Sequence, residues 1–191
     1  MSNSSSCSKA LLCTGCLLFS VAAVAHPADQ ALGVYLEGGE APHTEGNTSS
    51  VTAGIVVPWS HREPGVPPGA LTFYWDFFLS TWRAPVPSRL EKDSYTQAGV
   101  IANWRWRFDQ GASPWFVEAG VGGTVMDSIY RTASREFSTT FQFTEQVGVG
   151  RNFGPQGEHE LSFRVQHFSN AGIKEPNPGE NFYRVRYLYR F

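Results

Sequence analysis

Apolar and polar residues alternate along most of the chain after residue 31. Eight segments follow this two-residue period, at residues 32–37, 51–59, 71–80, 100–108, 115–122, 141–149, 161–166 and 184–191. A two-residue period is typical of β-strands, because successive side chains point to opposite faces of a sheet. The segment at 71–80 is the clearest, with apolar members Leu71, Phe73, Trp75, Phe77 and Leu79. The pattern therefore predicts an all-β fold of eight strands.

The two faces of these segments differ in chemistry. The polar face carries several charged residues, among them Arg105, Arg107, Glu118, Arg164, Arg184 and Arg186. The other face is nearly free of charge and rich in aromatic side chains, as lipid contact requires. In an eight-stranded barrel the charged face lines a narrow interior where opposite charges can pair, and closure removes unpaired strand edges. We predict an antiparallel transmembrane β-barrel of the outer-membrane type. A soluble lipocalin-like barrel or sandwich is the alternative, with the polar face in water.

The connections and the N-terminus agree with an outer-membrane barrel. Residues 1–25 resemble a secretion signal, with Lys9, a long apolar run and the small-residue pattern Ala23-Val24-Ala25, which leaves residues 26–191 for the barrel. Short connections at 109–114 and 154–157 alternate with longer polar ones after the odd-numbered segments, the pattern of short periplasmic turns and long extracellular loops. The proline-rich connection at 58–69 is longer than such a turn should be.

Composition narrows the possible chemistry. Aromatic residues make up 14% of the 191 residues and charged residues 17%, below the roughly 25% of soluble domains. A net charge of −2 gives no reason to expect a nucleic-acid partner. All three cysteines lie within the predicted signal, so a mature chain has no thiolate metal site, disulfide or cysteine nucleophile. The histidines show no metal-ligand spacing, so the residue pattern gives no sign of a metal site.

One pair of residues suggests a reaction. His167 and Ser169 continue the outward parity of Leu161, Phe163 and Val165, at the end of a strand that precedes a long loop. This predicts a histidine and a serine on the outer wall, at the outer-leaflet level where lipopolysaccharide lies. Imidazole can accept the proton of a serine hydroxyl and so activate it as a nucleophile. A His-x-Ser pair is also common by chance, and two polar residues at a membrane interface are the simpler interpretation.

A longer motif favours the reaction. The run HFSNAGIKEPNPGEN at 167–181 resembles the lipid A 3-O-deacylase (PagL) family. The resemblance implies an esterase of a Gram-negative outer membrane that removes the acyl chain at the 3 position of lipid A in lipopolysaccharide. It also implies a Ser-His-Glu triad on the outer wall, with Ser169 as nucleophile, His167 as base and Glu180 as acid, and neither a metal nor a cofactor. The family's glutamate falls one position later, where this chain has Asn181.

The register offers a second acid. If residues 154–157 form a tight turn, Glu145 lies near His167 and points outward, where an unpaired carboxylate is costly unless it has a function. A bulge that turns Glu145 inward is the alternative. For the oxyanion, the motif supplies Asn170, the backbone of Gly172, and Asn177 as candidate donors. Lys174 could meet a lipid A phosphate, although a solvated loop lysine is the simpler interpretation.

Two further functions compete with the deacylase. A non-enzymatic barrel could brace the membrane or bind partners through its loops, and it would be indifferent to Ser169. A lipid A acyltransferase would add mass to an acceptor instead of removing an acyl chain. A pore is not expected, because side chains fill a barrel of eight strands. The sequence leaves a homodimer open.

Overall fold

The computed structural model describes residues 27–44, 46–59, 70–85 and 92–191. The predicted signal at 1–25 and residues 60–69 of the proline-rich connection lie outside these ranges. The elements are η1 (Pro27–Gln30), β1 (Gly33–Ala41), β2 (Thr48–Trp59), β3 (Leu71–Pro85), β4 (Lys92–Arg107), η2 (Asp109–Gly111), β5 (Trp115–Met126), β6 (Phe141–Phe153), β7 (His159–Ser169) and β8 (Glu180–Arg190). All eight predicted strands are present.

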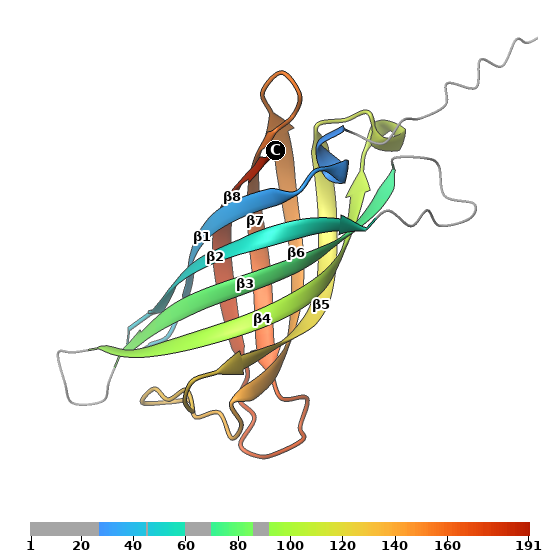
Figure 1. Cartoon of the computed structure of the whole chain (residues 1–191). Coiled ribbons are helices and arrows are strands. Elements are labelled where there is room, and N and C mark those ends of the chain that lie inside the picture. The colour runs from blue at the N-terminus through green and yellow to red at the C-terminus, as the bar shows by residue number, and fades with distance from the viewer. Residues whose placement is uncertain (1–26, 45, 60–69, 86–91) are drawn as a thin grey trace, which may run out of the picture.

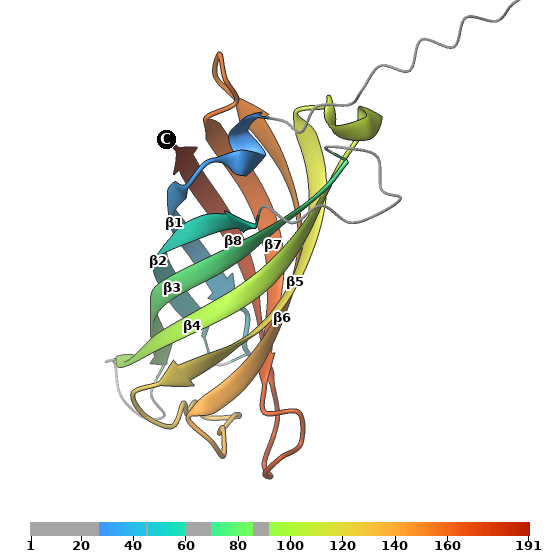
Figure 2. The ribbon, with the colours of Figure 1, turned by 45° about the vertical axis from the view of Figure 1, so that its right-hand side comes forward.

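The strands close into a barrel in which each strand pairs with its neighbours in sequence and β8 pairs with β1 (Figure 1). Every pairing is antiparallel. The same closed wall of tilted strands is seen after a 45° turn (Figure 2). Closure leaves no strand edge without a partner, which is what a lipid environment requires of backbone N–H and C=O groups. The predicted eight-stranded antiparallel barrel is confirmed.

The predicted faces are also confirmed. The outward side chains of β5 include Trp115, Val117 and Val121, which are all exposed, whereas Phe116 and Glu118 point inward and are buried. The same alternation runs along β8, where every second residue from Glu180 to Arg190 is buried. The outward aliphatic and aromatic side chains together form an apolar surface much larger than the exposed patches of water-soluble proteins. Such a surface matches the lipid-facing wall of a membrane barrel.

Charged side chains pair inside the barrel. Arg105 lies 2.9 Å from Glu118 and 2.7 Å from Glu160, and all three side chains are buried. Arg186 of β8 lies 2.7 Å from Asp76 of β3. Buried charges of this kind are tolerated only when an opposite charge and hydrogen bonds compensate them. Among the described residues, paired charged side chains therefore occupy the interior of the barrel.

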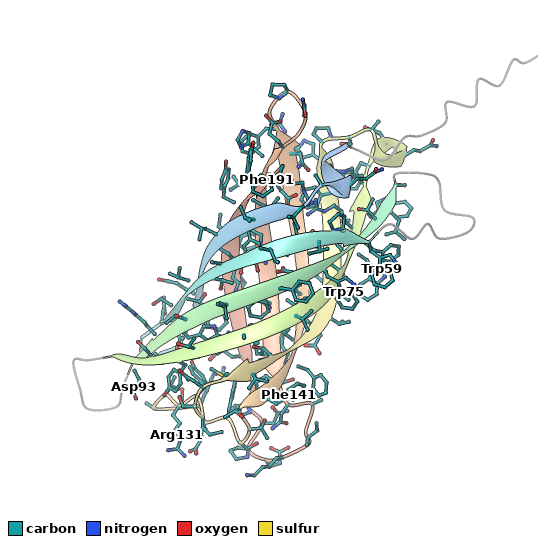
Figure 3. All side chains as sticks on the ribbon, in the orientation of Figure 1. Trp59, Trp75, Asp93, Arg131, Phe141 and Phe191 are labelled. Atoms are coloured by element: carbon teal, nitrogen blue, oxygen red, sulfur yellow. The ribbon has the colours of Figure 1, made fainter. Side chains whose placement is uncertain are left out.

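The two ends of the barrel differ. The end at which β1–β2, β3–β4, β5–β6 and β7–β8 connect is called the loop end, and the opposite end, with η1, η2 and the β6–β7 turn, is called the turn end (Figure 1). Aromatic side chains lie near both ends of the barrel: Trp59 and Trp75 contact each other near the turn end, and Phe141 lies near the loop end (Figure 3). None of the described residues belongs to a helix long and apolar enough to cross a membrane.

An aromatic cluster fills the interior at the loop end. The ring of Trp82 lies 4.9 Å from that of Phe168 on β7 and 4.4 Å from that of Phe182 on β8, measured between centroids. Tyr130, from the β5–β6 loop, packs against Trp82 at 5.3 Å. All of these side chains are buried. The cluster holds the loop ends of β7 and β8 from inside the barrel. It therefore also fixes the positions of the outward side chains at these ends.

Candidate active site

His167 and Ser169 lie on the outer wall at the loop end, as predicted. Ser169 is the last residue of β7 and His167 precedes it by two, so the two side chains share a face and are about 7 Å apart along the strand. Both are partly exposed, while Phe168 between them is buried in the aromatic cluster. Because Phe168 is held by packing, the strand cannot rotate its serine and histidine away from the surface.

Strand β8 holds the imidazole of His167. The Nδ1 atom lies 2.8 Å from Oδ1 of Asn181, the residue that opposes His167 in the β7–β8 register. Gly179 lies under the other side of the ring: a methyl group on its Cα would be 2.7 Å from Cε1 and 3.2 Å from Nε2 of His167. Continuing the register by one step sets Gly179 opposite Ser169. The ring is therefore bonded through Nδ1 and lies with Nε2 toward the level of Ser169.

This contact fixes the proton on the imidazole. An amide oxygen accepts hydrogen bonds and does not donate them, so Nδ1 of His167 carries a hydrogen in this arrangement, and in the neutral imidazole Nε2 then has the lone pair. A base needs that lone pair to take a proton from a hydroxyl. No hydrogen bond joins Ser169 to His167 among the described residues, and such bonds are often loose before substrate binds.

Glu180 points into the barrel and not toward His167. Its side chain is 2% exposed, and its carboxylate accepts a hydrogen bond of 2.9 Å from the hydroxyl of Tyr130 and lies 3.0 Å from Nε2 of His43. The reason is parity: Glu180 opposes the buried Phe168, whereas its neighbour Asn181 opposes His167. The geometry does not support the predicted role of Glu180 as the group that orients His167.

Glu145 opposes His167 from the other side. It pairs with His167 in the regular β6–β7 register, so the predicted register is confirmed and no bulge turns Glu145 inward. Directly opposed residues of an antiparallel pair have Cβ atoms about 5 Å apart. The carboxylate is exposed on the outer wall and has no ion pair within the described ranges. The outward row across three strands thus reads Glu145, His167, Asn181.

The three candidate oxyanion donors differ in what they already bind. Asn170 is buried, and its amide nitrogen donates to the hydroxyl of Ser138 at 2.9 Å and to the carbonyl of Lys174 at 2.7 Å. The N–H of Gly172 donates to Oδ1 of Asn170 at 2.9 Å. Asn177 accepts the N–H of Asn170 with its Oδ1 at 3.0 Å, and its Nδ2 has no partner among the described residues. Asn177 is therefore the candidate with a free donor.

The β5–β6 loop holds the β7–β8 loop in place. Arg135 donates through Nη1 to the carbonyl oxygens of Pro178 at 3.1 Å and Gly179 at 2.6 Å. Ser138 donates to the carbonyl of Lys174 at 2.7 Å. Lys174 itself is exposed. These bonds support the backbone on which the imidazole rests.

The predicted site did not include Gly179, and it gave Asn181 no role. Parity was the available signal for Asn181, because it shares the outward face with Tyr183 and Val185. Nothing in the residue pattern marks the contact of Gly179 with the imidazole. Among the described residues, no group of three or more histidine, cysteine or acidic side chains could hold a metal ion.

Comparisons with known proteins agree on one family. The family described as Lipid A 3-O-deacylase (PagL) matches residues 48–190. The chain is 38% identical over 95 residues to the lipid A deacylase PagL of Bordetella bronchiseptica, covering 50% of each, and 29% identical over 119 residues to that of Pseudomonas aeruginosa, covering 62% of the chain and 65% of the relative. The match thus spans about half to two thirds of the length of these relatives.

A solved structure shares the fold. The barrel matches the crystal structure of the outer membrane enzyme PagL with a TM-score of 0.68 and 22% sequence identity, over 83% of this chain and 99% of the other. The family match covers all eight strands except β1 and includes the whole of the site described above. The chain belongs to the lipid A 3-O-deacylase (PagL) family.

Proposed function

We propose that the protein is an outer-membrane esterase that hydrolyses the 3-O-acyl ester of lipid A, with Ser169 as nucleophile and His167 as base. Family membership supports the substrate class. The observation that carries the proposal is the imidazole of His167, bonded through Nδ1 to Asn181 with Nε2 free, on the same outward face as Ser169.

The position on the barrel suits a lipid substrate. The apolar wall lies in the bilayer, and the loop end, with its longer polar connections, faces the outside of the cell. Lipopolysaccharide fills the outer leaflet there, so its acyl linkages reach the level at which β7 ends. The ester can approach from the membrane without entering the barrel, whose interior is filled by paired charges.

The reaction follows from the free lone pair of Nε2. As Ser169 Oγ attacks the ester carbonyl, Nε2 of His167 takes the hydroxyl proton, and the negative charge that develops on the carbonyl oxygen meets the Nδ2 donor of Asn177. The C–O bond to the sugar breaks, and His167 returns the proton to the leaving sugar oxygen. Water then repeats the same steps on the acyl-serine and releases a free fatty acid.

Two groups divide the work of the missing triad carboxylate. Asn181 orients the imidazole and fixes its proton on Nδ1, a role that an asparagine also has in papain-like proteases. A neutral amide stabilises the imidazolium ion less than a carboxylate does. Glu145, opposite His167 on β6, supplies the negative charge from the other side. Glu180 contributes to the loop-end interior and not to the reaction.

The mass of lipid A tests the proposal. Cells that express the protein should contain lipid A that has lost one acyl chain, and Ser169→Ala or His167→Ala should abolish this loss while the barrel still folds. Ser128→Ala, an exposed serine in the β5–β6 loop, is the control and should behave as wild type. Wild-type deacylation by Ser169→Ala would overturn the proposal, a gain of acyl mass would indicate an acyltransferase, and an unchanged profile would indicate a non-enzymatic barrel.

A further inference from the structure

A polar cleft opens at the loop end, where its lining residue Pro178 precedes Gly179, the residue in contact with the imidazole of His167. We call it the rim cleft. Its lining residues come from three loops, and they are Pro42, His43, Thr44, Ser134, Arg135 and Pro178. Its volume is about 760 Å³, enough for a phosphorylated sugar. The proposed reaction uses none of these residues.

The rim cleft borders the reacting centre on the β1 side. Pro178 precedes Gly179, whose Cα lies against the imidazole of His167. In the β1–β8 register Glu40 opposes Tyr183, and two more steps set Pro42 opposite Asn181. A glycolipid whose acyl ester is at Ser169 must direct its saccharide away from the bilayer, which is toward this rim. The group that enters the cleft is therefore part of the substrate's polar head.

Arg135 gives the cleft a cation with unused donors. A guanidinium has five N–H donors, and here Nη1 alone serves the carbonyl oxygens of Pro178 and Gly179. Its Nε is 4.0 Å from the Glu180 carboxylate, and its Nη2 makes no hydrogen bond to any described residue. The side chain is 31% exposed, so a ligand in the cleft can reach it.

The nearby carboxylate of Glu180 is held below the cleft by other groups. Glu180 receives hydrogen bonds from the hydroxyl of Tyr130 at 2.9 Å and from the N–H of Asn181 at 3.0 Å, and it lies 3.0 Å from Nε2 of His43. At 2% exposure it also lies beneath the surface of the cleft. Among the described residues that line the cleft, Arg135 is therefore the cation that a ligand can reach directly, whereas the Glu180 carboxylate is buried below it.

We propose that the rim cleft binds an oxyanion on the saccharide head of the substrate, a phosphate ester or a sugar carboxylate, through the guanidinium of Arg135. The planar guanidinium donates two parallel hydrogen bonds to such groups, and Thr44 belongs to the same lining. This inference rests on the proposed function, since it names the part of the same substrate that is recognised. Its consequence is selection of glycolipids that carry an anion close to the scissile ester.

Arg135 also supports the loop beneath His167, so the test must separate recognition from support. Binding is measured with the full-length Ser169→Ala protein in detergent micelles, which holds the lipid without hydrolysing it. Three lipids are compared: phosphorylated lipid A, dephosphorylated lipid A, and dephosphorylated lipid A that carries an acidic sugar. Arg135→Gln is the variant, and Arg131→Gln is the matched control because Arg131 lies in the same loop, is exposed and pairs with Glu136.

Recognition predicts a loss that depends on the anion. Arg135→Gln should weaken binding of an anionic lipid about tenfold and leave binding of the neutral lipid unchanged, while Arg131→Gln changes neither. The anionic lipid that responds, phosphorylated or acidic-sugar, identifies the source of the oxyanion. Inorganic phosphate should compete with the phosphorylated lipid in the Ser169→Ala protein but not in its Arg135→Gln derivative if phosphate is that source.

Other results would overturn the inference. An equal loss for charged and neutral lipids would assign Arg135 a supporting role alone, and equal binding of all three lipids before mutation would show that the cleft reads no anion. Arg135→Lys, which keeps the charge, provides a folded variant if Arg135→Gln does not assemble, and it should lose part of the preference. Because binding needs no hydrolysis, failure of the deacylase proposal would appear separately, as unchanged lipid A mass in cells.

Discussion

Nδ1 of His167 lies 2.8 Å from the side-chain oxygen of Asn181, across the β7–β8 pair. The contact fixes the tautomer that a general base requires, without a carboxylate on that side of the ring. In serine hydrolases the third group both orients the imidazole and stabilises its positive charge. In the proposed reaction the two tasks are divided between Asn181 and Glu145, which flank His167 from the neighbouring strands β8 and β6.

Replacing Asn181 should change turnover and not substrate binding. Asn181→Ala removes the acceptor that holds Nδ1–H, and we expect kcat to fall about tenfold or more with little change in KM, because the imidazole loses its orientation. Asn181→Glu restores an acceptor and adds a charge, and should raise kcat above that of the natural chain. Steady-state kinetics on purified lipid A measure both. Unchanged kcat in Asn181→Ala would mean that Asn181 has no part in the reaction.

The two carboxylates should give opposite phenotypes. Glu145→Gln removes the charge opposite His167, and we expect kcat to fall about tenfold with an unchanged unfolding midpoint. Glu180→Gln leaves kcat within about threefold but lowers the free energy of unfolding by about 1–3 kcal/mol, because the groups that contact Glu180 lose a buried partner.

A double variant provides the control for Glu145. If Glu145 acts through the charge of the imidazolium ion, Glu145→Gln should cost much less in an Asn181→Glu background, where a second carboxylate is present. Equal losses in the two backgrounds would contradict this account. A large loss of kcat in Glu180→Gln with normal stability would return Glu180 to the reaction.

The fold follows from the sequence because one physical rule acts on every residue of a membrane barrel. A strand side chain faces either lipid or the polar interior, so alternation reports both the strand and its faces. The rule fails where strands rise beyond the bilayer. Residues 92–99 of β4 were not predicted, because both faces there carry polar residues such as Asp93, Ser94 and Thr96 and the alternation is lost.

The sequence predicted those parts of the site that follow from the alternation of inward and outward side chains along a strand. His167 and Ser169 extend a clear alternation, and their outward position is as expected. Glu180 follows an irregular loop, where the residue at which β8 begins sets the face of every side chain after it, and a shift of one residue reverses the face. Family resemblance pointed to a glutamate near this position, and the register assigns the outward place to Asn181.

The close contact between Gly179 and His167 predicts a sensitive position. A methyl group at residue 179 would lie 2.7 Å from Cε1 of the imidazole, and the backbone there has φ of +63°, which disfavours any side chain. Gly179→Ala should therefore displace the ring and lower kcat at least tenfold. Gly46→Ala is the control. Gly46 also has a positive φ, of +116°, but the atom nearest to an added methyl group would be 3.7 Å away. Similar kcat values for the two variants would exclude a role for the contact.

At the turn end, Asp29 ties η1 to the barrel interior and should make stability depend on pH. Its carboxylate lies 2.5 Å from Nε of Arg107 and 3.0 Å from Nη1 of Arg105. Burial by itself would raise the pKa of Asp29, but the hydrogen bond from Arg107 and the charges of both arginines outweigh it and hold the pKa below its ordinary 3.8. The stabilisation by Asp29 is therefore complete above about pH 4.

This contribution should be lost as pH falls from the ordinary pKa of the unfolded chain through the lowered pKa of the folded protein, because over this range the unfolded chain binds more protons at Asp29 than the folded one. Asp29→Asn imitates the protonated side chain at every pH and should cost about 1–3 kcal/mol at pH 6, since two buried guanidinium groups lose a charged partner. Urea unfolding of both proteins from pH 6 to pH 2 measures the difference. We expect it to shrink toward zero at the acid end, where other interior carboxylates affect both proteins alike. A difference that stays constant over this range would mean that Asp29 stabilises η1 through its shape and not through its charge.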